Sequence, residues 1–120
     1  ITTNKEIVIE EVTSHALGLR AAGNQFAQLI PGNRRAPVQA TKIFTTQSSS
    51  FEVVPYQGPS KRNAIIDDKY IQLKPIDITG VELDAKGSAD VKVTFSVNEQ
   101  QILFVKIEAP GVYEERQMEY

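Results

Sequence analysis

The sequence predicts an all-β protein, an antiparallel β-sandwich of seven to eight short strands. Short runs of β-branched and aromatic residues alternate with clusters of Pro, Gly, Ser and Asn, which favour turns. The segment Val91–Val97 alternates apolar and polar residues with a period of two, as a half-buried strand does. No heptad pattern and no long amphipathic helix interrupts this series, so we expect one domain built from two packed sheets.

Four strands are expected in the first half of the chain, each bounded by turn-forming residues. They are Val12–Leu19, Gln25–Ile30, Val38–Thr46 and Phe51–Gln57. Pro31, Gly32 and Asn33 are three turn formers in a row, and they separate the second strand from the third. Pro55 cannot donate a ladder hydrogen bond, so its end of the fourth strand is expected at a sheet edge or a bulge.

The second half predicts a fifth strand over Lys69–Ile76 and a hairpin of Val91–Val97 with Ile102–Ile107. Val91, Val93, Phe95 and Val97 should face the core, and Lys92, Thr94 and Ser96 should face out. Residues 77–90 fit either a long loop or an irregular strand. Residues 112–120 fit a helix, with two acidic residues in its first turn, or a strand that alternates towards Met118 and Tyr120, and we favour the strand.

Composition excludes several classes of function. Thirteen basic residues stand against 15 acidic ones, and a net charge of −2 predicts no strong attraction to nucleic acid or to an anionic membrane. No apolar run approaches the ~20 residues that span a bilayer. The absence of cysteine excludes a disulfide framework and a thiolate metal site, and it is compatible with the cytoplasmic location that we expect. The first residue is not Met, so we expect a piece of a longer protein.

The residues that could carry catalysis are badly placed for it. Neighbouring residues of an extended strand point to opposite faces, so Ser14 and His15 cannot form a nucleophile–base pair. The same geometry separates the adjacent carboxylates of Glu10-Glu11, Asp67-Asp68 and Glu114-Glu115. No nucleotide-binding glycine motif and no metalloprotease motif occurs. We therefore predict no enzyme activity, no catalytic residue and no metal site, and a binding function instead.

An ordered series of short motifs runs from the first expected strand to the fourth. Its residues are Val12, Thr13, Leu17, Gly18, Leu29, Ile30, Asn33, Pro37, Phe44, Thr46, Gln57 and Gly58. This order resembles the start of the peptide-binding domain of the seventy-kilodalton heat-shock chaperones, the DnaK family. The paired strands at Val91–Val97 and Ile102–Ala109 extend the resemblance over most of the chain.

The resemblance implies a division of the chain into two parts. Residues 12–120 would be the β-sandwich domain, without the helical lid that follows it in the family. Residues 1–11 would be the interdomain linker, which docks Ile7, Val8 and Ile9 on an ATPase domain outside this sequence; Glu10 stands where the family continues with an apolar residue. From the residues alone, this run also fits a frayed edge strand. The resemblance further implies ATP in the missing domain only, no cofactor in this one, and a J-domain co-chaperone as a partner.

The family's groove lies between the loop joining strands one and two and the loop joining strands three and four. Carried over residue by residue, the implied peptide-binding set is Leu19, Ala21, Ala22, Phe44, Thr46, Gln47, Phe51, Val53 and Val91. Ala22 and Gln47 would form an arch over the peptide, and Ala21 and Thr46 would present backbone groups to it. The other five would line a central pocket. Without the resemblance, four of these five, Phe51 excepted, fit a plain sandwich core as well.

The expected function is that of a chaperone substrate-binding domain, which holds short extended hydrophobic segments of unfolded proteins under the control of ATP. Phe51 stands where the family has a small β-branched residue, and its ring could overfill the pocket. An alternative function follows from that departure, namely a sandwich with an occluded groove that docks a specific partner or associates with itself. A chance match to an unrelated structural sandwich is a further alternative.

Overall fold

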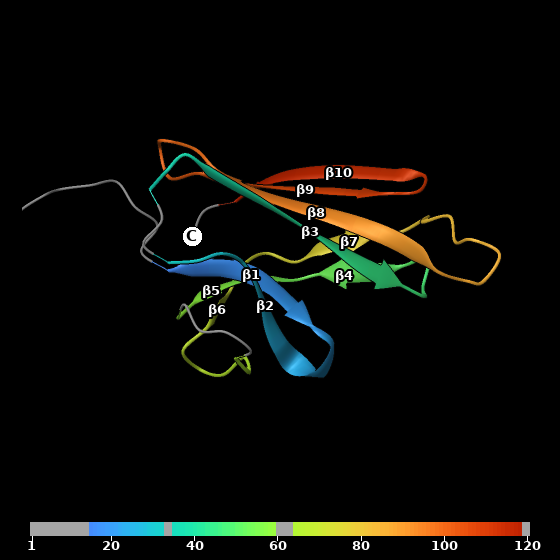
Figure 1. Cartoon of the computed structure of the whole chain (residues 1–120), viewed down its shortest axis with the longest axis horizontal. Coiled ribbons are helices and arrows are strands. Elements are labelled where there is room, and N and C mark those ends of the chain that lie inside the picture. Colours follow the sequence, from blue (N-terminus) through green and yellow to red (C-terminus); the bar gives the residue numbers. More distant parts are fainter. Residues whose placement is uncertain (1–14, 33–34, 60–63, 119–120) are drawn as a thin grey trace, which may run out of the picture.

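The computed structural model describes residues 15–32, 35–59 and 64–118. These residues form ten β-strands and one single-turn 3₁₀ helix, η2 (Ala22–Asn24) (Figure 1). The strands are β1 (Ala16–Ala21), β2 (Gln25–Ile30), β3 (Val38–Thr46), β4 (Phe51–Val53), β5 (Pro55–Gly58), β6 (Ile71–Gln72), β7 (Ile76–Ile78), β8 (Ala89–Val97), β9 (Leu103–Ala109) and β10 (Val112–Met118). Within these ranges no helix has the length and apolar character needed to cross a bilayer.

The strands form two layers, and every ladder is antiparallel. One sheet has the order β2-β1-β5-β6, the other has the order β10-β9-β8-β3, and β4 pairs with β7. Figure 1 shows the long strands β3, β8, β9 and β10 on one side and the shorter strands β1, β2, β5 and β6 on the other. The antiparallel all-β sandwich that the sequence predicts is confirmed.

The strand count exceeds the expected seven to eight because two expected strands are each split in two. The run Phe51–Gln57 becomes β4 and β5, which are separated at Val54. The run Lys69–Ile76 becomes the two-residue β6 and the start of β7. Pro55 thus opens a new strand, and the irregularity that we expected there takes the form of a change of partner from β7 to β1.

The main core lies between the layers and follows the predicted alternation of β8. Val91, Val93, Phe95 and Val97 are all buried, with exposed fractions of 2% or less. Alternate residues of β9 are buried beside them. Thr94 differs from expectation, because it was predicted to face out with Lys92 and Ser96 and is only 5% exposed. Its hydroxyl lies 3.0 Å from the hydroxyl of Thr41 across the β3–β8 ladder, which satisfies both groups.

A second, smaller core covers the other face of β1 and β5. It contains Ala16, Phe26, Val54, Tyr56, Ala64 and Tyr70. The rings of Phe26 and Tyr70 lie 4.8 Å apart between centroids, in a tilted arrangement. The first four residues of β1 are therefore buried between the two cores, whereas Arg20 near its end is exposed.

The structure decides two of the alternatives left open by the sequence. Residues 112–118 are the strand β10, and the helix alternative is wrong for them. Most of residues 77–90 is a loop, bounded by the end of β7 and the start of β8. The expected linker, residues 1–11 with Ile7, Val8 and Ile9, lies outside the described residues, as do Asn33 and Tyr120.

Candidate functional site

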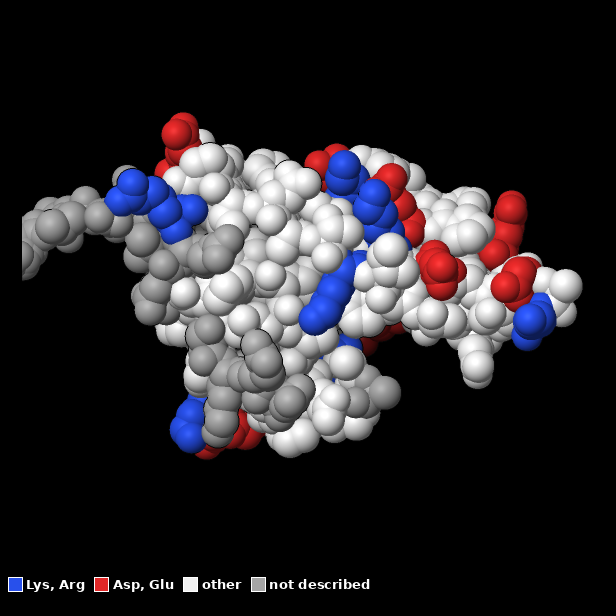
Figure 2. Space-filling view, viewed as in Figure 1, with Lys and Arg blue, Asp and Glu red and all other residues white. Residues whose placement is uncertain are grey.

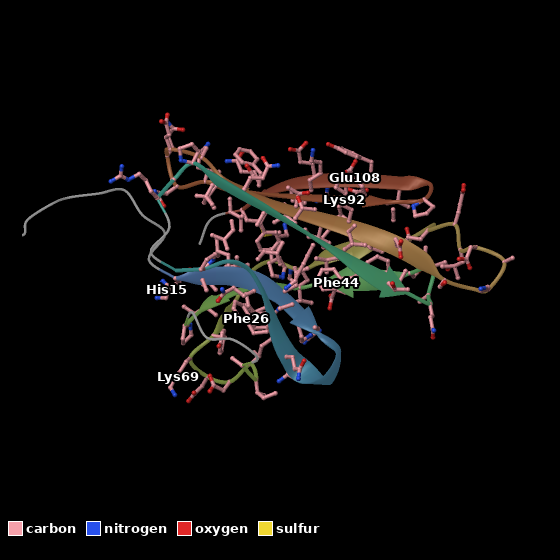
Figure 3. The ribbon with its side chains drawn as sticks, in the orientation of Figure 1. His15, Phe26, Phe44, Lys69, Lys92 and Glu108 are labelled. Carbon is pink, nitrogen blue, oxygen red and sulfur yellow. The ribbon has the colours of Figure 1, made fainter. Side chains whose placement is uncertain are left out.

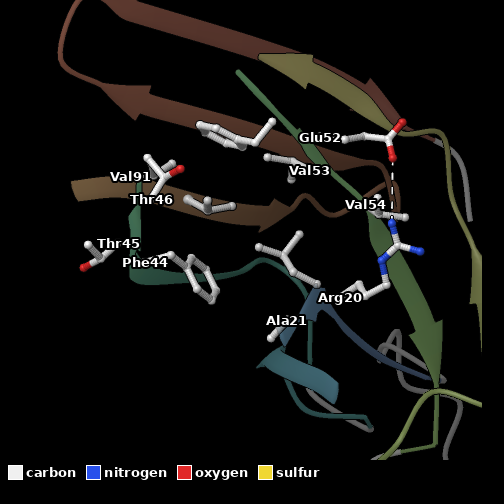
Figure 4. Close-up of a pocket in the computed structure, with 12 residues that line it drawn as sticks. Arg20, Ala21, Phe44, Thr45, Thr46, Glu52, Val53, Val54 and Val91 are labelled. Atoms are coloured by element: carbon white, nitrogen blue, oxygen red, sulfur yellow. Dashed lines mark ion pairs between the residues drawn. The ribbon is translucent and has the colours of Figure 1, made fainter. Parts of the chain in front are cut away.

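A cavity of about 420 Å³ opens where β1, β3, β4 and β8 converge (Figure 4). Its size falls within the range of roughly 300–1,000 Å³ that is typical of ligand sites. Most of the side chains that line it are apolar. They are Leu19, Arg20, Ala21, Phe44, Thr45, Thr46, Phe51, Glu52, Val53, Val54, Val91 and Val93.

Strand periodicity and register bring the apolar side chains of the cavity together. Phe51 and Val53 are two residues apart in β4, so both point to the same face of that strand. Phe44 of β3 is the direct antiparallel partner of Val91 in β8. Phe44 comes from the long-strand layer (Figure 3), and Leu19 reaches the same space from β1. The cavity therefore lies where three separately hydrogen-bonded units meet.

The structure gathers most of the predicted binding residues around this one cavity. Seven of the nine line it, and Gln47, which is also among the described side chains, does not. Ala22 belongs to η2, and Gln47 is exposed in the loop after β3. The arch that these two would form stays a prediction. A role of all nine in binding a peptide stays a prediction.

The five apolar residues predicted to line a pocket were also predicted, Phe51 excepted, to fit a plain sandwich core, and the two interpretations are compatible. Leu19, Val53 and Val91 are buried members of the main core, while Phe44 and Phe51 are partly buried and packed against it. All five also line the cavity. The same side chains therefore pack in or against the main core of the sandwich and also form the apolar wall of the cavity.

Phe51 forms part of the wall and leaves the cavity open. The volume of about 420 Å³ is measured with its ring in place. Phe51 lies in β4, which pairs with β7, and it packs against the main core. Overfilling of the pocket by this ring, and with it the alternative function of an occluded groove, stays a prediction.

Sequence reasoning missed five lining residues: Arg20, Thr45, Glu52, Val54 and Val93. Arg20, Thr45 and Glu52 each lie beside a predicted site residue, where strict alternation assigns them to the opposite face. The cavity lies near the ends of β1, β3 and β4, so residues of both parities reach it. Arg20 and Glu52 form an ion pair there, with 3.8 Å between Nη2 and Oε1.

The loop from β3 to β4 is held by its own hydroxyl groups. The Ser48 amide donates to Thr46 Oγ1 at 3.1 Å, and the Ser48 hydroxyl donates to the Ser50 carbonyl at 2.6 Å. The Val81 amide donates to the Ser49 carbonyl at 3.1 Å and ties the loop to the segment after β7. These bonds fix the loop next to the cavity before any ligand arrives.

The site has the chemistry of a binding surface. In the part of the chain that the structure describes, its only charged lining residues are one Arg and one Glu that pair with each other. Within the described ranges, no three His, Cys, Asp or Glu side chains gather as a metal site would require. On the face drawn in Figure 2, basic and acidic residues are interspersed. An apolar cavity beside strand ends suits the side chain of an extended peptide.

Comparison with known proteins identifies relatives over almost the whole chain. A family model described as Hsp70 protein matches residues 2–119. The "Chaperone protein DnaK" of Thermosipho africanus is 31% identical over 117 residues, which cover 95% of this chain and 19% of that relative. The "Heat shock protein SSC3, mitochondrial" of Saccharomyces cerevisiae is 31% identical over 103 residues, which cover 83% of this chain and 15% of that relative. The chain thus spans about a fifth or less of the curated relatives that it matches.

Proposed function

The chain belongs to the Hsp70 family, and we propose that it is the substrate-binding β-sandwich domain of a divergent chaperone of this family. In this proposal the cavity between β1, β3, β4 and β8 holds one apolar side chain of a short, extended segment of an unfolded protein. The observation that carries the proposal is the position of the predicted residues. Seven of the nine, drawn from four strands, line one open apolar cavity.

The backbone around the cavity supports the binding of an extended chain. Among the described residues, β3 is the last strand of its sheet, so one edge of its backbone is free of ladder partners. A peptide can bind such an edge through main-chain hydrogen bonds while a pocket selects one side chain. Thr46 at the end of β3 and Ala21 at the end of β1 would supply backbone groups on the two sides of the cavity.

The proposal extends to the parts of the protein beyond this chain. Residues 1–11 would be the linker, with Ile7, Val8 and Ile9 docking on an ATPase domain, and residues 12–120 would be the binding domain. ATP would bind in the other domain and control affinity here, and a J-domain co-chaperone would act on that cycle. The length of the DnaK relatives, of which this chain matches 19%, supports such further domains. The isolated chain should hydrolyse no ATP. One relative is named as mitochondrial, and a cytoplasmic location stays a prediction.

Fluorescence anisotropy with a labelled leucine-rich heptapeptide tests the proposed function. We expect saturable binding that Phe44→Ala weakens about tenfold or more, equivalent to about 1.4 kcal/mol, since a pocket residue near the centre of a site carries much of the binding energy. Phe104→Ala is the matched control. Phe104 is also a partly buried phenylalanine in a long strand, but it lies in β9 and does not line the cavity.

Two outcomes would contradict the proposal. One is the absence of saturable binding by the unaltered chain. The other is equal weakening by Phe44→Ala and Phe104→Ala, which would show a general loss of structure. Phe51→Val distinguishes the proposed function from the alternative of an occluded groove. Peptide binding that appears only in this variant would mean that the Phe51 ring blocks the groove in solution.

A further inference from the structure

We propose that Arg20 selects among bound segments by charge and favours an acidic residue next to the apolar side chain that enters the cavity. This inference rests on the proposed function and adds a preference to it. Among the described residues, Arg20 and Glu52 are the only charged ones that line the cavity. They come from β1 and β4 and lie on the same side of the opening (Figure 4).

The contact between the two charges leaves the guanidinium group available. The shortest separation, from Nη2 to Oε1, is 3.8 Å, which is longer than the 2.7–3.2 Å of a typical N–H···O hydrogen bond. The ion pair therefore uses none of the five N–H donors of Arg20 at hydrogen-bonding distance. A carboxylate from a ligand can accept two of these donors in parallel, which is the strongest arrangement for this pair of groups.

Because both side chains are partly exposed, replacing Glu52 by a ligand carboxylate as the partner of Arg20 costs little free energy. The side chains of Arg20 and Glu52 are 42% and 47% exposed, and exposed pairs of this kind contribute little to stability. The main chain of Arg20 is fixed separately, because its amide donates to the Val54 carbonyl at 3.0 Å. A ligand carboxylate can thus displace Glu52 without disturbing the position of β1.

The two members of the pair are not equivalent towards a ligand. Each ligand charge would be repelled by the other member of the pair, whose two charged atoms lie 3.8 Å apart, so repulsion does not distinguish the two cases. The difference is geometric: Arg20 presents a planar fork that matches a carboxylate in two bonds, whereas a lysine on Glu52 would be a single point charge. At the other end of the cavity, Thr45 donates to Asp90 at 3.3 Å, which places an acidic group there. An acidic ligand residue is therefore favoured only on the flank that faces Arg20.

The test compares isomeric peptides. The labelled neutral leucine heptapeptide is the parent, and single Asp or single Lys residues are placed on either flank. We expect one of the two Asp isomers to bind about two- to fivefold more tightly than the parent at low ionic strength, in line with exposed charge pairs. The gain should fade at about 1 M salt, where the Debye length is about 3 Å. Arg20→Gln should abolish the gain, and Glu52→Gln should increase it.

Arg116→Gln is the matched control, since it removes the same charge from an exposed Arg that pairs with Glu114 in β10, away from the cavity lining. It should leave the gain intact. Binding of the parent peptide without any gain for either Asp isomer, or a gain that survives Arg20→Gln, overturns this inference and leaves the proposed function standing. Failure of every peptide, the parent included, overturns both.

Discussion

Replacement of Gly58 by Ala gives a direct measure of how the smaller core is packed. A methyl group built at this position would lie 2.3 Å from Cδ2 of Tyr70 and 2.8 Å from Cε2. Contacts this short do not persist, so the ring must move. Gly58 does not have a positive φ, so the backbone conformation itself accepts Ala and the whole effect is steric.

Two responses are open to Tyr70, and their costs decide the expected result. Full expulsion of the ring would expose roughly 150–250 Å² of aromatic surface, which costs about 4–6 kcal/mol at ~25 cal/mol per Å². A tilt of the ring within its site costs about 1–3 kcal/mol, as overpacked cores do. The tilt is cheaper, so we expect Gly58→Ala to lower the free energy of unfolding by about 2 kcal/mol.

The assay is urea unfolding of four proteins: the unaltered chain, Gly58→Ala, Tyr70→Ala and the double variant. If the ring is the obstacle, Gly58→Ala should cost little once Tyr70 is Ala, with a coupling energy of at least about 1 kcal/mol. Near-ultraviolet circular dichroism should report a changed environment of Tyr70 and Phe26, whose centroids lie 4.8 Å apart. Additive costs in the double variant would refute the steric explanation.

Two further predictions concern hydrogen bonds away from the cavity. The backbone amides of Ser88 and Lys86 donate hydrogen bonds to Asp84 and lower the pKa of its carboxyl below the ordinary value of 3.8. The folded chain therefore gains stability from this carboxylate above pH 3.8 and loses it as the pH falls through the lowered pKa. Asp84→Asn should make the melting temperature depend less on pH in that acid range. Thr41→Val should cost about 1–2 kcal/mol, because it leaves the buried hydroxyl of Thr94 without its partner at 3.0 Å. Thr94→Val should cost less in the same melts, because Thr41 is exposed and its hydroxyl can bond to water, and the double variant should be close to neutral.

Local turn chemistry accounts for the parts of the fold that the sequence predicts well. The bounds of β2 and β3 match the expected Gln25–Ile30 and Val38–Thr46, because Pro and Gly residues lie between these two runs. The two-residue β6 could not be predicted. It exists only because Tyr56 and Gln57 of β5 lie opposite Gln72 and Ile71, which is information that no local pattern carries.

The candidate site was predictable only in part, for reasons of geometry. Alternation and the family resemblance together found the apolar wall, since Phe51 and Val53 share a face. Arg20 and Glu52 were missed because alternation applies within a paired strand and fails where strands end. The arch of Ala22 and Gln47 came from the resemblance alone; Gln47 does not line the cavity, and the arch stays a prediction.

Pro55 connects the irregular strand pairing to the existence of the cavity. It lies where the chain leaves the ladder with β7 and joins the ladder with β1. Val53 packs in the main core, and Val54 and Tyr56, on either side of Pro55, pack in the smaller one. A continuous strand would keep one set of ladder partners from Phe51 to Gly58 and would carry β4 along with the sheet of β1. The switch at Pro55 keeps β4 apart as a third unit, and the apolar cavity occupies the junction that this separation creates.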